Sequence, residues 1–151
     1  MQDLGADVNQ AMAHGITVLL AAAHVGCVAM VRCLVLELGA NVRQARDDGV
    51  TPVAMAASNG HLDLLRCLVK ELGADLNQAN KEGMATLSIV ACNDCLDVVR
   101  CLSRSWHGGA VAVDQANEAG EAPLYFAAFT GHLARDVVKS TQGWSRHQQG
   151  F

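Results

Sequence analysis

The sequence predicts an all-α solenoid, in which helix pairs stack side by side and hairpin loops project from one edge. The first observation is a repeated phrase, since GADVNQA, GANVRQA and GADLNQA begin 34 residues apart, at Gly5, Gly39 and Gly73. The second is the tripeptide Arg-Cys-Leu, which keeps the same interval from Arg32 to Arg66 to Arg100. Recurrence with a period of about 20 to 50 residues is the signature of repeat architectures, whose units bury one another's apolar faces.

Composition agrees with such a stack. The 151 residues are 51% hydrophobic but only 4% aromatic, so the predicted core is built from Ala, Leu and Val. The repeat predicts one domain over residues 1–139. It divides into a partial unit 1–14, three units at 15–48, 49–82 and 83–119, and a truncated unit 120–139. Residues 140–151 leave the repeat register and are expected to form a disordered polar tail. A start inside a hairpin and an end outside the register suggest a fragment of a longer array.

The second unit shows how each element is expected to form. Thr51 can cap free N–H groups and Pro52 fits the first helical position, so a short helix is predicted from Pro52. The chain reverses at residues 59–61, and a second helix is predicted from Leu62 to Leu72, with its leucines on one face and its charges on the other. Gly73 ends this helix. The polar residues 74–83 then predict a projecting hairpin.

These units resemble the ankyrin repeat family. The residues that carry the resemblance are GVTPVAMAASNGH from Gly49 and the G-A-D-L-N phrase at Gly73, with their copies in register from residue 4 to about 134. The rival 34-residue family, the tetratricopeptide repeat, lacks that phrase. The third unit departs furthest from the pattern. It has Ala85-Thr86 in place of Thr-Pro, and Asp94 where a turn glycine is expected, so we expect it to be the least stable unit.

Charge and cysteine content exclude several classes of protein. The net charge of −4 comes from interspersed acids and bases, so no basic stripe for nucleic acid is present. The apolar stretch 16–31 is shorter than the roughly 20 residues that span a bilayer, so no membrane association is expected. Six cysteines without a secretory signal indicate a reducing, cytoplasmic compartment. A monomer without cofactor or small-molecule substrate is expected.

Cys92 and Cys95 form a C-x-x-C, with Cys101 and His107 downstream, which on ligand types alone could hold zinc or act in redox chemistry. Repetition favours a different interpretation. Cys101 is the third copy of a helix position, and Cys95 occupies a position where other units carry Cys27 or a histidine. Packing explains a repeated position, because free cysteine behaves as a small hydrophobe. No metal, no catalytic residue and no enzymatic activity are therefore expected.

The resemblance implies a non-catalytic protein–protein interaction module. Its partner, another protein, would bind the concave face formed by the first helices and the hairpin tips. The alternative is a partner-recruiting segment of a larger enzyme or of a ubiquitin-ligase adaptor. The family's variable contact positions fall on Ala13, His14, Ile16, His24, Val25, Asp47, Asp48, Val50, Ser58, Asn59, Lys81, Glu82, Met84, Cys92, Asn93, Glu118, Ala119, Glu121, Phe129 and Thr130. Among them Phe129 is the aromatic candidate for a binding hot spot.

Overall fold

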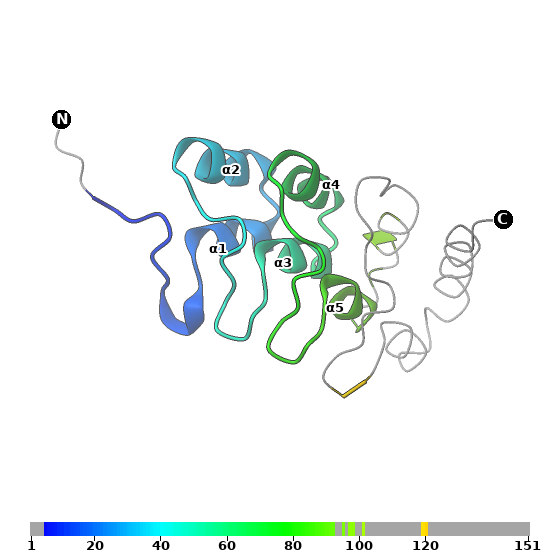
Figure 1. The fold of residues 1–151 in the computed structure, drawn as a ribbon. Helices are drawn as coiled ribbons and strands as arrows, with labels where there is room; N and C mark the ends of the chain where they lie inside the picture. The colour runs from blue at the N-terminus through cyan, green and yellow to red at the C-terminus, as the bar shows by residue number, and fades with distance from the viewer. Residues whose placement is uncertain (1–4, 93–94, 96, 99–100, 102–118, 121–151) are drawn as a thin grey trace.

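The computed structural model describes residues 5–92, 95, 97–98, 101 and 119–120, and the described part is helical (Figure 1). No β-strand occurs among these residues, which confirms the all-α prediction. The helical elements are η1 (Ala13–Gly15), α1 (Val18–Val25), α2 (Val28–Arg32), η2 (Cys33–Glu37), α3 (Pro52–Ser58), α4 (Leu62–Arg66), η3 (Cys67–Glu71) and α5 (Thr86–Cys92).

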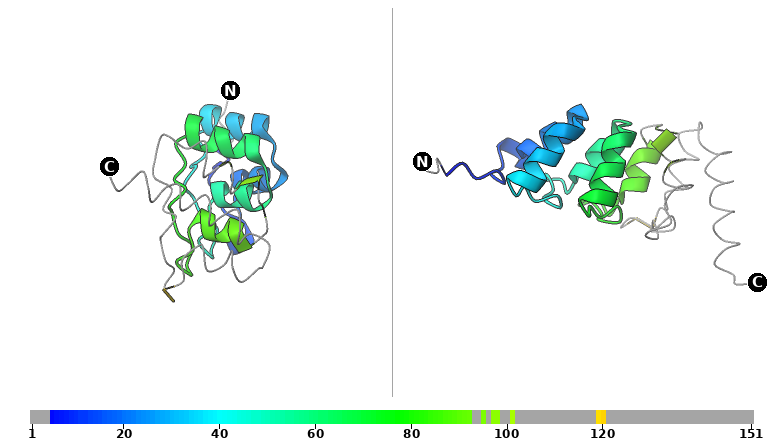
Figure 2. Two further views of the ribbon diagram at one scale, coloured as in Figure 1. Left: turned by 90° about the vertical axis from the view of Figure 1, so that its right-hand side faces the viewer. Right: turned by 90° about the horizontal axis from the view of Figure 1, so that it is seen from above.

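The helices lie in two rows. The first helices of successive repeats, α1, α3 and α5, contact one another in one row, and α2 and α4 form the second row against α1 and α3 (Figures 1 and 2). The loops between repeats project away from the second row and lie beside one another. This is the arrangement predicted from the repeats, because each helix pair buries its apolar surface against the next pair.

The first helices begin where the sequence predicts. The hydroxyl of Thr51 accepts a hydrogen bond from the backbone N–H of Ala54 at 3.3 Å, and Pro52 is the first helical residue. In the repeat before it, Thr17 accepts from the N–H of Leu20 at 3.2 Å. The third repeat has Ala85 at this position, so α5 begins without a side-chain cap. One N-terminal N–H group of α5 therefore lacks the acceptor that its equivalents have.

The second helix of the first two repeats changes its hydrogen-bond pattern part-way along. The predicted helix 62–72 is present as α4 followed without a break by η3, but η3 is a π-helical turn. There the N–H of Leu72 donates to the carbonyl of Cys67 five residues back, at 3.1 Å, and Gly73 follows with a positive φ of 70°. Side-chain periodicity hardly differs over one such turn, so the sequence pattern predicted the extent of this helix but not its π geometry.

The core combines alanines and larger aliphatic residues on the first helices with mainly leucines on the second. Ala56 and Ala57 of α3 are fully buried, which allows α1 and α5 to approach closely. In the second row the side chains of Leu64, Leu65 and Leu68 are buried as predicted. The opposite face carries the exposed residues Asp63, Arg66 and Lys70. This segregation confirms the predicted amphipathic pattern.

The repeated G-A-D phrase forms a turn stabilised by its own side chain. The carboxylate of Asp7 accepts a hydrogen bond from the N–H of Asn9 at 2.9 Å, and the carboxylate of Asp75 accepts from Asn77 at the same distance. In the hairpin between them Asn41 plays this part, accepting from Arg43 at 3.0 Å. Aspartate and asparagine suit such turns because their short side chains can accept from the backbone two residues on.

Part of the predicted organisation lies outside the described residues. This applies to most of the unit 83–119 after α5, to the truncated unit 120–139, to the tail 140–151 and to the turn residue Asp94. Cys27, Cys33, Cys67 and Cys101 are free thiols. Within the described part of the chain, no helix combines the length and apolar character needed to cross a membrane.

Candidate functional site

The tips of the three described hairpins carry the largest group of the predicted contact residues. His14, Asp47, Asp48, Lys81 and Glu82 are all exposed there, and together they are called the tip ridge below. Ala13 is also exposed and lies beside His14 in η1. The sequence placed these residues on the projecting loops, and the structure confirms that location.

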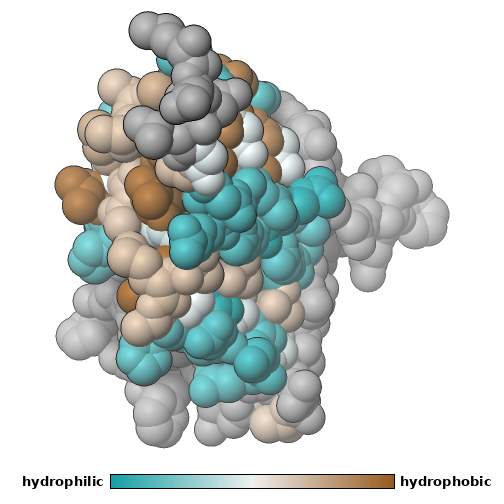
Figure 3. All heavy atoms as spheres, turned by 90° about the vertical axis from the view of Figure 1, so that its left-hand side faces the viewer, coloured by the Kyte–Doolittle hydropathy of each residue, from teal (hydrophilic) through white to brown (hydrophobic). Residues whose placement is uncertain are grey.

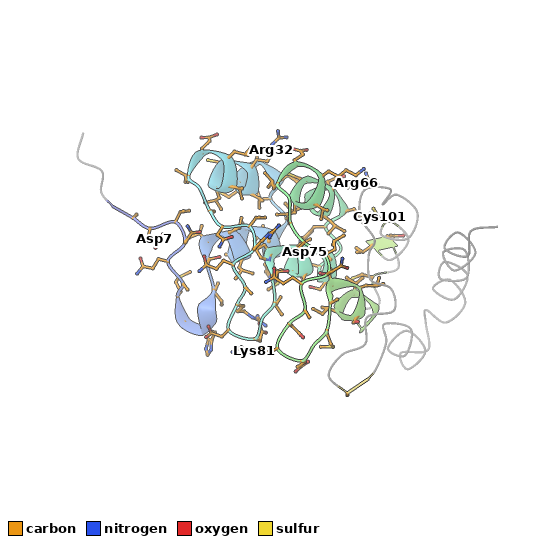
Figure 4. The ribbon with its side chains drawn as sticks, in the orientation of Figure 1. Asp7, Arg32, Arg66, Asp75, Lys81 and Cys101 are labelled. Carbon is orange, nitrogen blue, oxygen red and sulfur yellow. The ribbon has the colours of Figure 1, made fainter. Side chains whose placement is uncertain are left out.

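The tip ridge lies opposite the repeated arginines. Figure 4 shows Lys81 on a projecting loop, whereas Arg32 and Arg66 lie on the second row of helices, at the other edge of the molecule. Both arginine side chains are about half exposed there. The repeated Arg-Cys-Leu tripeptide is thus remote from the candidate site, as expected for a position that recurs because of packing.

Backbone hydrogen bonds join neighbouring tips. The N–H of Asp47 donates to the carbonyl of His14 at 3.1 Å, and the N–H of Lys81 donates to the carbonyl of Asp48 at 2.9 Å. Since these bonds use main-chain atoms, they hold three hairpins in fixed register whatever side chains the tips carry. The tip ridge is therefore a continuous surface formed from three repeats.

One tip side chain is held by a neighbour that the sequence reasoning missed. The guanidinium Nε of Arg46 lies 3.0 Å from both carboxylate oxygens of Asp48, and its Nη2 also pairs with that carboxylate. The carboxylate further accepts from the N–H of Val50 at 3.1 Å. The Arg46 hydrogen bond lowers the pKa of Asp48, and the Val50 N–H acts in the same direction. Asp48 is thus oriented within its own hairpin.

The ends of the first helices form the second group of predicted contacts. His24, Val25 and Asn59 are exposed, while Ser58 is half-buried and donates its hydroxyl to the carbonyl of Met55 at 3.1 Å. The amide nitrogen of Asn59 lies 3.4 Å from the Nδ1 atom of His24, one repeat earlier. The helix ends of neighbouring repeats are thus also in contact. Their contact uses side chains, whereas the hairpin tips are joined by backbone hydrogen bonds.

The apolar candidates at the hairpin bases are less accessible to a partner protein than the residues at the tips. Ile16, Val50 and Met84 are half-buried, and the carbonyl of each accepts the hydrogen bond that closes its hairpin, at 2.8 to 2.9 Å. Their first role is therefore structural.

The remaining candidates are described in part or not at all. Cys92 ends α5, and Ala119 is exposed. The side chain of Cys92 and the residues Asn93, Glu118, Glu121, Phe129 and Thr130 lie outside the described part of the chain.

Among the described cysteines, Cys67 is buried as a packing residue, whereas Cys27 is exposed. Cys95, half of the C-x-x-C, donates its thiol to the carbonyl of Ser58 at 3.2 Å, and Cys101 is buried. Burial raises the pKa values of the Cys33 and Cys67 thiols, so the thiolate that metals and electrophiles require is disfavoured at both. No cluster of three or more His, Cys, Asp or Glu side chains suited to a metal occurs among the described residues.

Comparison with known families agrees with this geometry. The model of ankyrin repeats, in three copies, matches residues 2–80, which is just over half of the chain. The chain belongs to the ankyrin repeat family. Ankyrin repeats are in general protein–protein interaction modules and are generally not catalytic. No curated protein matches the chain significantly.

Proposed function

We propose that this ankyrin repeat chain is a non-catalytic interaction module that binds a partner protein through the tip ridge and the adjoining ends of α1 and α3. These ends comprise His24, Val25, Ser58 and Asn59. The proposal includes a monomeric, cytoplasmic protein that needs no cofactor, small-molecule substrate, nucleic acid or membrane. It rests above all on the backbone hydrogen bonds between neighbouring tips.

Because these hydrogen bonds use backbone atoms, the packing of the hairpins does not depend on which side chains the tips carry. The N–H groups of Asp47 and Lys81 make the contacts between hairpins, so the side chains of these residues can vary without loss of the register. A surface held in this way loses little conformational entropy when a partner binds, which favours affinity. The asparagine Asn80 adds to this rigidity, because its side-chain oxygen accepts from the N–H groups of Glu82 and Met84 at 3.0 and 2.9 Å.

The charges of the tip ridge indicate the kind of surface that would fit it. Asp47, Asp48 and Glu82 carry negative charge, against a single Lys81. Such a ridge repels phosphate groups and complements a partner that presents basic residues to the second hairpin. The Arg46 pairing neutralises much of the Asp48 charge, so Asp47 is the acid with the greater influence on an approaching cation.

Two double variants with equal changes in charge test the proposal. Lys81→Ala with Glu82→Ala removes one cation and one anion from the tip ridge, but keeps the Lys81 and Glu82 backbone hydrogen bonds. Asp63→Ala with Arg66→Ala removes one anion and one cation from α4, where the two side chains form only a long 3.9 Å contact. Both variants should stay folded, and both keep the net charge.

The full chain serves as bait, and its captured partners are compared with those of the two variants by quantitative mass spectrometry. Affinity for the purified partner is then measured by calorimetric titration. We expect the tip variant to weaken binding at least about tenfold, a loss of about 1.4 kcal/mol, and the α4 variant to change it less than about twofold. Loss of binding in the α4 variant with retention in the tip variant would refute the proposed surface.

A further inference from the structure

The end of the array formed by the first repeat is apolar and exposed. Val18, Met30 and Leu38 are 46%, 50% and 58% exposed, and Cys33 beside them is half-buried. Figure 3 looks onto this end and shows hydrophobic atoms over much of its upper and left part, next to a hydrophilic band. These four residues are called the leading face below.

The leading face repeats, position by position, a surface that is covered one repeat later. The residues 34 positions on are Pro52, Leu64 and Cys67, which are buried, and Leu72, which is half-buried. They belong to the helix pair of the second repeat, which packs against that of the first. The side chains of the leading face therefore stand at stacking positions.

Not every exposed apolar residue of the first repeat has a covered equivalent in the second repeat, as a neighbouring leucine shows. Leu36 is 62% exposed, but its equivalent Lys70 is exposed as well. This position points to solvent in both repeats, so the exposure of Leu36 indicates nothing about stacking. Exposure in the first repeat combined with burial in the second distinguishes Val18 and Met30 from such outward positions.

The polar rim of the leading face also follows the covered interface. Between the first two repeats, the guanidinium of Arg32 lies 3.3 Å from the carboxylate of Glu71. The first-repeat equivalent of Glu71 is Glu37, which is exposed and accepts a hydrogen bond from the Cys33 thiol at 3.6 Å. Glu37 thus offers a carboxylate where a neighbouring helix pair would bring an arginine.

The hairpin that such a neighbour would need is already in place. The carboxamide oxygen of Asn9 accepts from the N–H of Asn41 at 2.7 Å, and the Gln44 side chain donates to the Asn9 carbonyl at 2.9 Å. One repeat later, Gln78 makes the same contact with the Arg43 carbonyl at 3.4 Å. The hairpin 5–15 therefore occupies the regular position of a preceding hairpin beside the leading face.

We propose that the leading face binds an ankyrin-type helix pair that has no hairpin of its own and carries an arginine at the position of Arg32. The hairpin 5–15 completes this helix pair as a repeat. A second copy bound face to face fits less well, because its own leading end presents Glu37, whereas its Arg32 is directed to the second repeat. This surface is separate from the tip ridge, so the proposal stands independently of the proposed function.

The helix pair used as probe is the protein's own. Residues 15–38 are placed directly before Gly5 of the full chain, and this joint keeps the register because residues 5–14 are equivalent to 39–48. We expect the backbone amides of α1 to exchange with solvent at least about tenfold more slowly in the extended chain, since its exposed side becomes covered. The urea midpoint should also rise.

Two lysine substitutions at the original first repeat make the test specific. Met30→Lys should change neither exchange nor midpoint in the natural chain, but should abolish both gains in the extended chain. Leu36→Lys is the matched control, since it alters an equally exposed apolar residue and should have no effect in either chain. Unchanged α1 exchange in the extended chain, or equal effects of the two lysines there, would overturn the proposal. So would a dimer of the natural chain, seen by sedimentation, that Met30→Lys dissociates, because the occupant would then be a second copy.

Discussion

The Nε2 atom of His61 lies 2.8 Å from the backbone carbonyl oxygen of His24 in the preceding repeat. This carbonyl belongs to the last turn of α1, where the helix supplies no N–H partner of its own. A carbonyl can only accept, so Nε2 carries the proton. One repeat later the thiol of Cys95 donates to the carbonyl of Ser58 at 3.2 Å. The same position thus joins successive repeats, with imidazole in one case and thiol in the other.

Replacing His61 by alanine should therefore destabilise the array. The His24 carbonyl loses its donor and the half-buried ring loses its packing, so we expect the free energy of unfolding to fall by about 1 to 2 kcal/mol. His61→Cys is the informative comparison, because Cys95 shows that a thiol can make the equivalent contact. It should recover part of the loss. Urea unfolding of the three proteins measures the difference, and a cysteine variant no better than alanine would argue against the contact.

The sequence predicted the repeats better than the links between them. Repetition with capping signals such as Thr51-Pro52 was enough to predict the helices and their apolar faces, because each repeat carries similar residues at equivalent positions. The sequence predicts only a chain reversal at residues 59–61 and gives no prediction of the contact from His61 to His24. A link of this kind depends on the distance between repeats, which a single repeat does not contain. Its one signal was the alternation of His and Cys at that position.

The uncapped start of α5 gives a prediction about the third repeat. Thr17 and Thr51 cap the first helices of their repeats, but Ala85 stands at this position, and the buried hydroxyls of Thr86 and Ser88 have no hydrogen-bond partner. Ala85→Thr should supply the missing acceptor to the N–H of Ser88. We expect it to raise the free energy of unfolding by about 1 kcal/mol, as measured by denaturant melts.

Ala85→Val is the control for this substitution. Valine has the shape of threonine without the hydroxyl, so it adds the same volume at a buried site but offers no cap. If valine stabilised the protein as much as threonine, the gain would come from packing and the missing cap would not be its cause.

The Arg46–Asp48 pair predicts a dependence of stability on pH. Its hydrogen bond lowers the pKa of Asp48 below the ordinary value of 3.8, so the folded state favours the ionised carboxyl. The contribution to stability is then fully present above about pH 4 and is lost as the pH falls through the lowered pKa of the folded state. Because Asp48 is exposed, the contribution should stay below about 1 kcal/mol.

Asp48→Asn reveals this contribution. The difference in unfolding free energy between the natural chain and this variant should be largest near neutral pH and should shrink below about pH 4. An NMR titration of the Asp48 carboxyl gives the pKa directly. A midpoint at or above 3.8 would contradict the role assigned to Arg46.

The candidate site was predictable in its location but not in its internal contacts. Hairpin tips vary between repeats, and this variation singled out residues such as Asp47 and Lys81, which the structure places at the exposed tips. The pairing of Asp48 with Arg46 was not foreseen, since its sequence signal is only two opposite charges two residues apart. Val50 was expected to face a partner, yet it is half-buried, because its backbone closes the hairpin on which the tip depends.

The turn at Gly26 offers a test of how tightly the repeats are joined. Its φ is +83°, and a Cβ atom there would lie 2.5 to 2.7 Å from the ring of His61, so alanine must push the ring away from the His24 carbonyl. Gly39 is the matched control, with a φ of +72° and nothing within 4 Å. Gly39→Ala should cost only the left-handed backbone penalty of about 1 to 2 kcal/mol, and Gly26→Ala should cost about 1 kcal/mol more. In the His61→Ala background, however, Gly26→Ala should cost no more than Gly39→Ala, because the ring that it displaces is absent.

A double-mutant cycle by urea unfolding measures this coupling between Gly26 and His61. Strictly additive effects would mean that Gly26 and His61 act separately, and that the ring moves aside without losing its hydrogen bond.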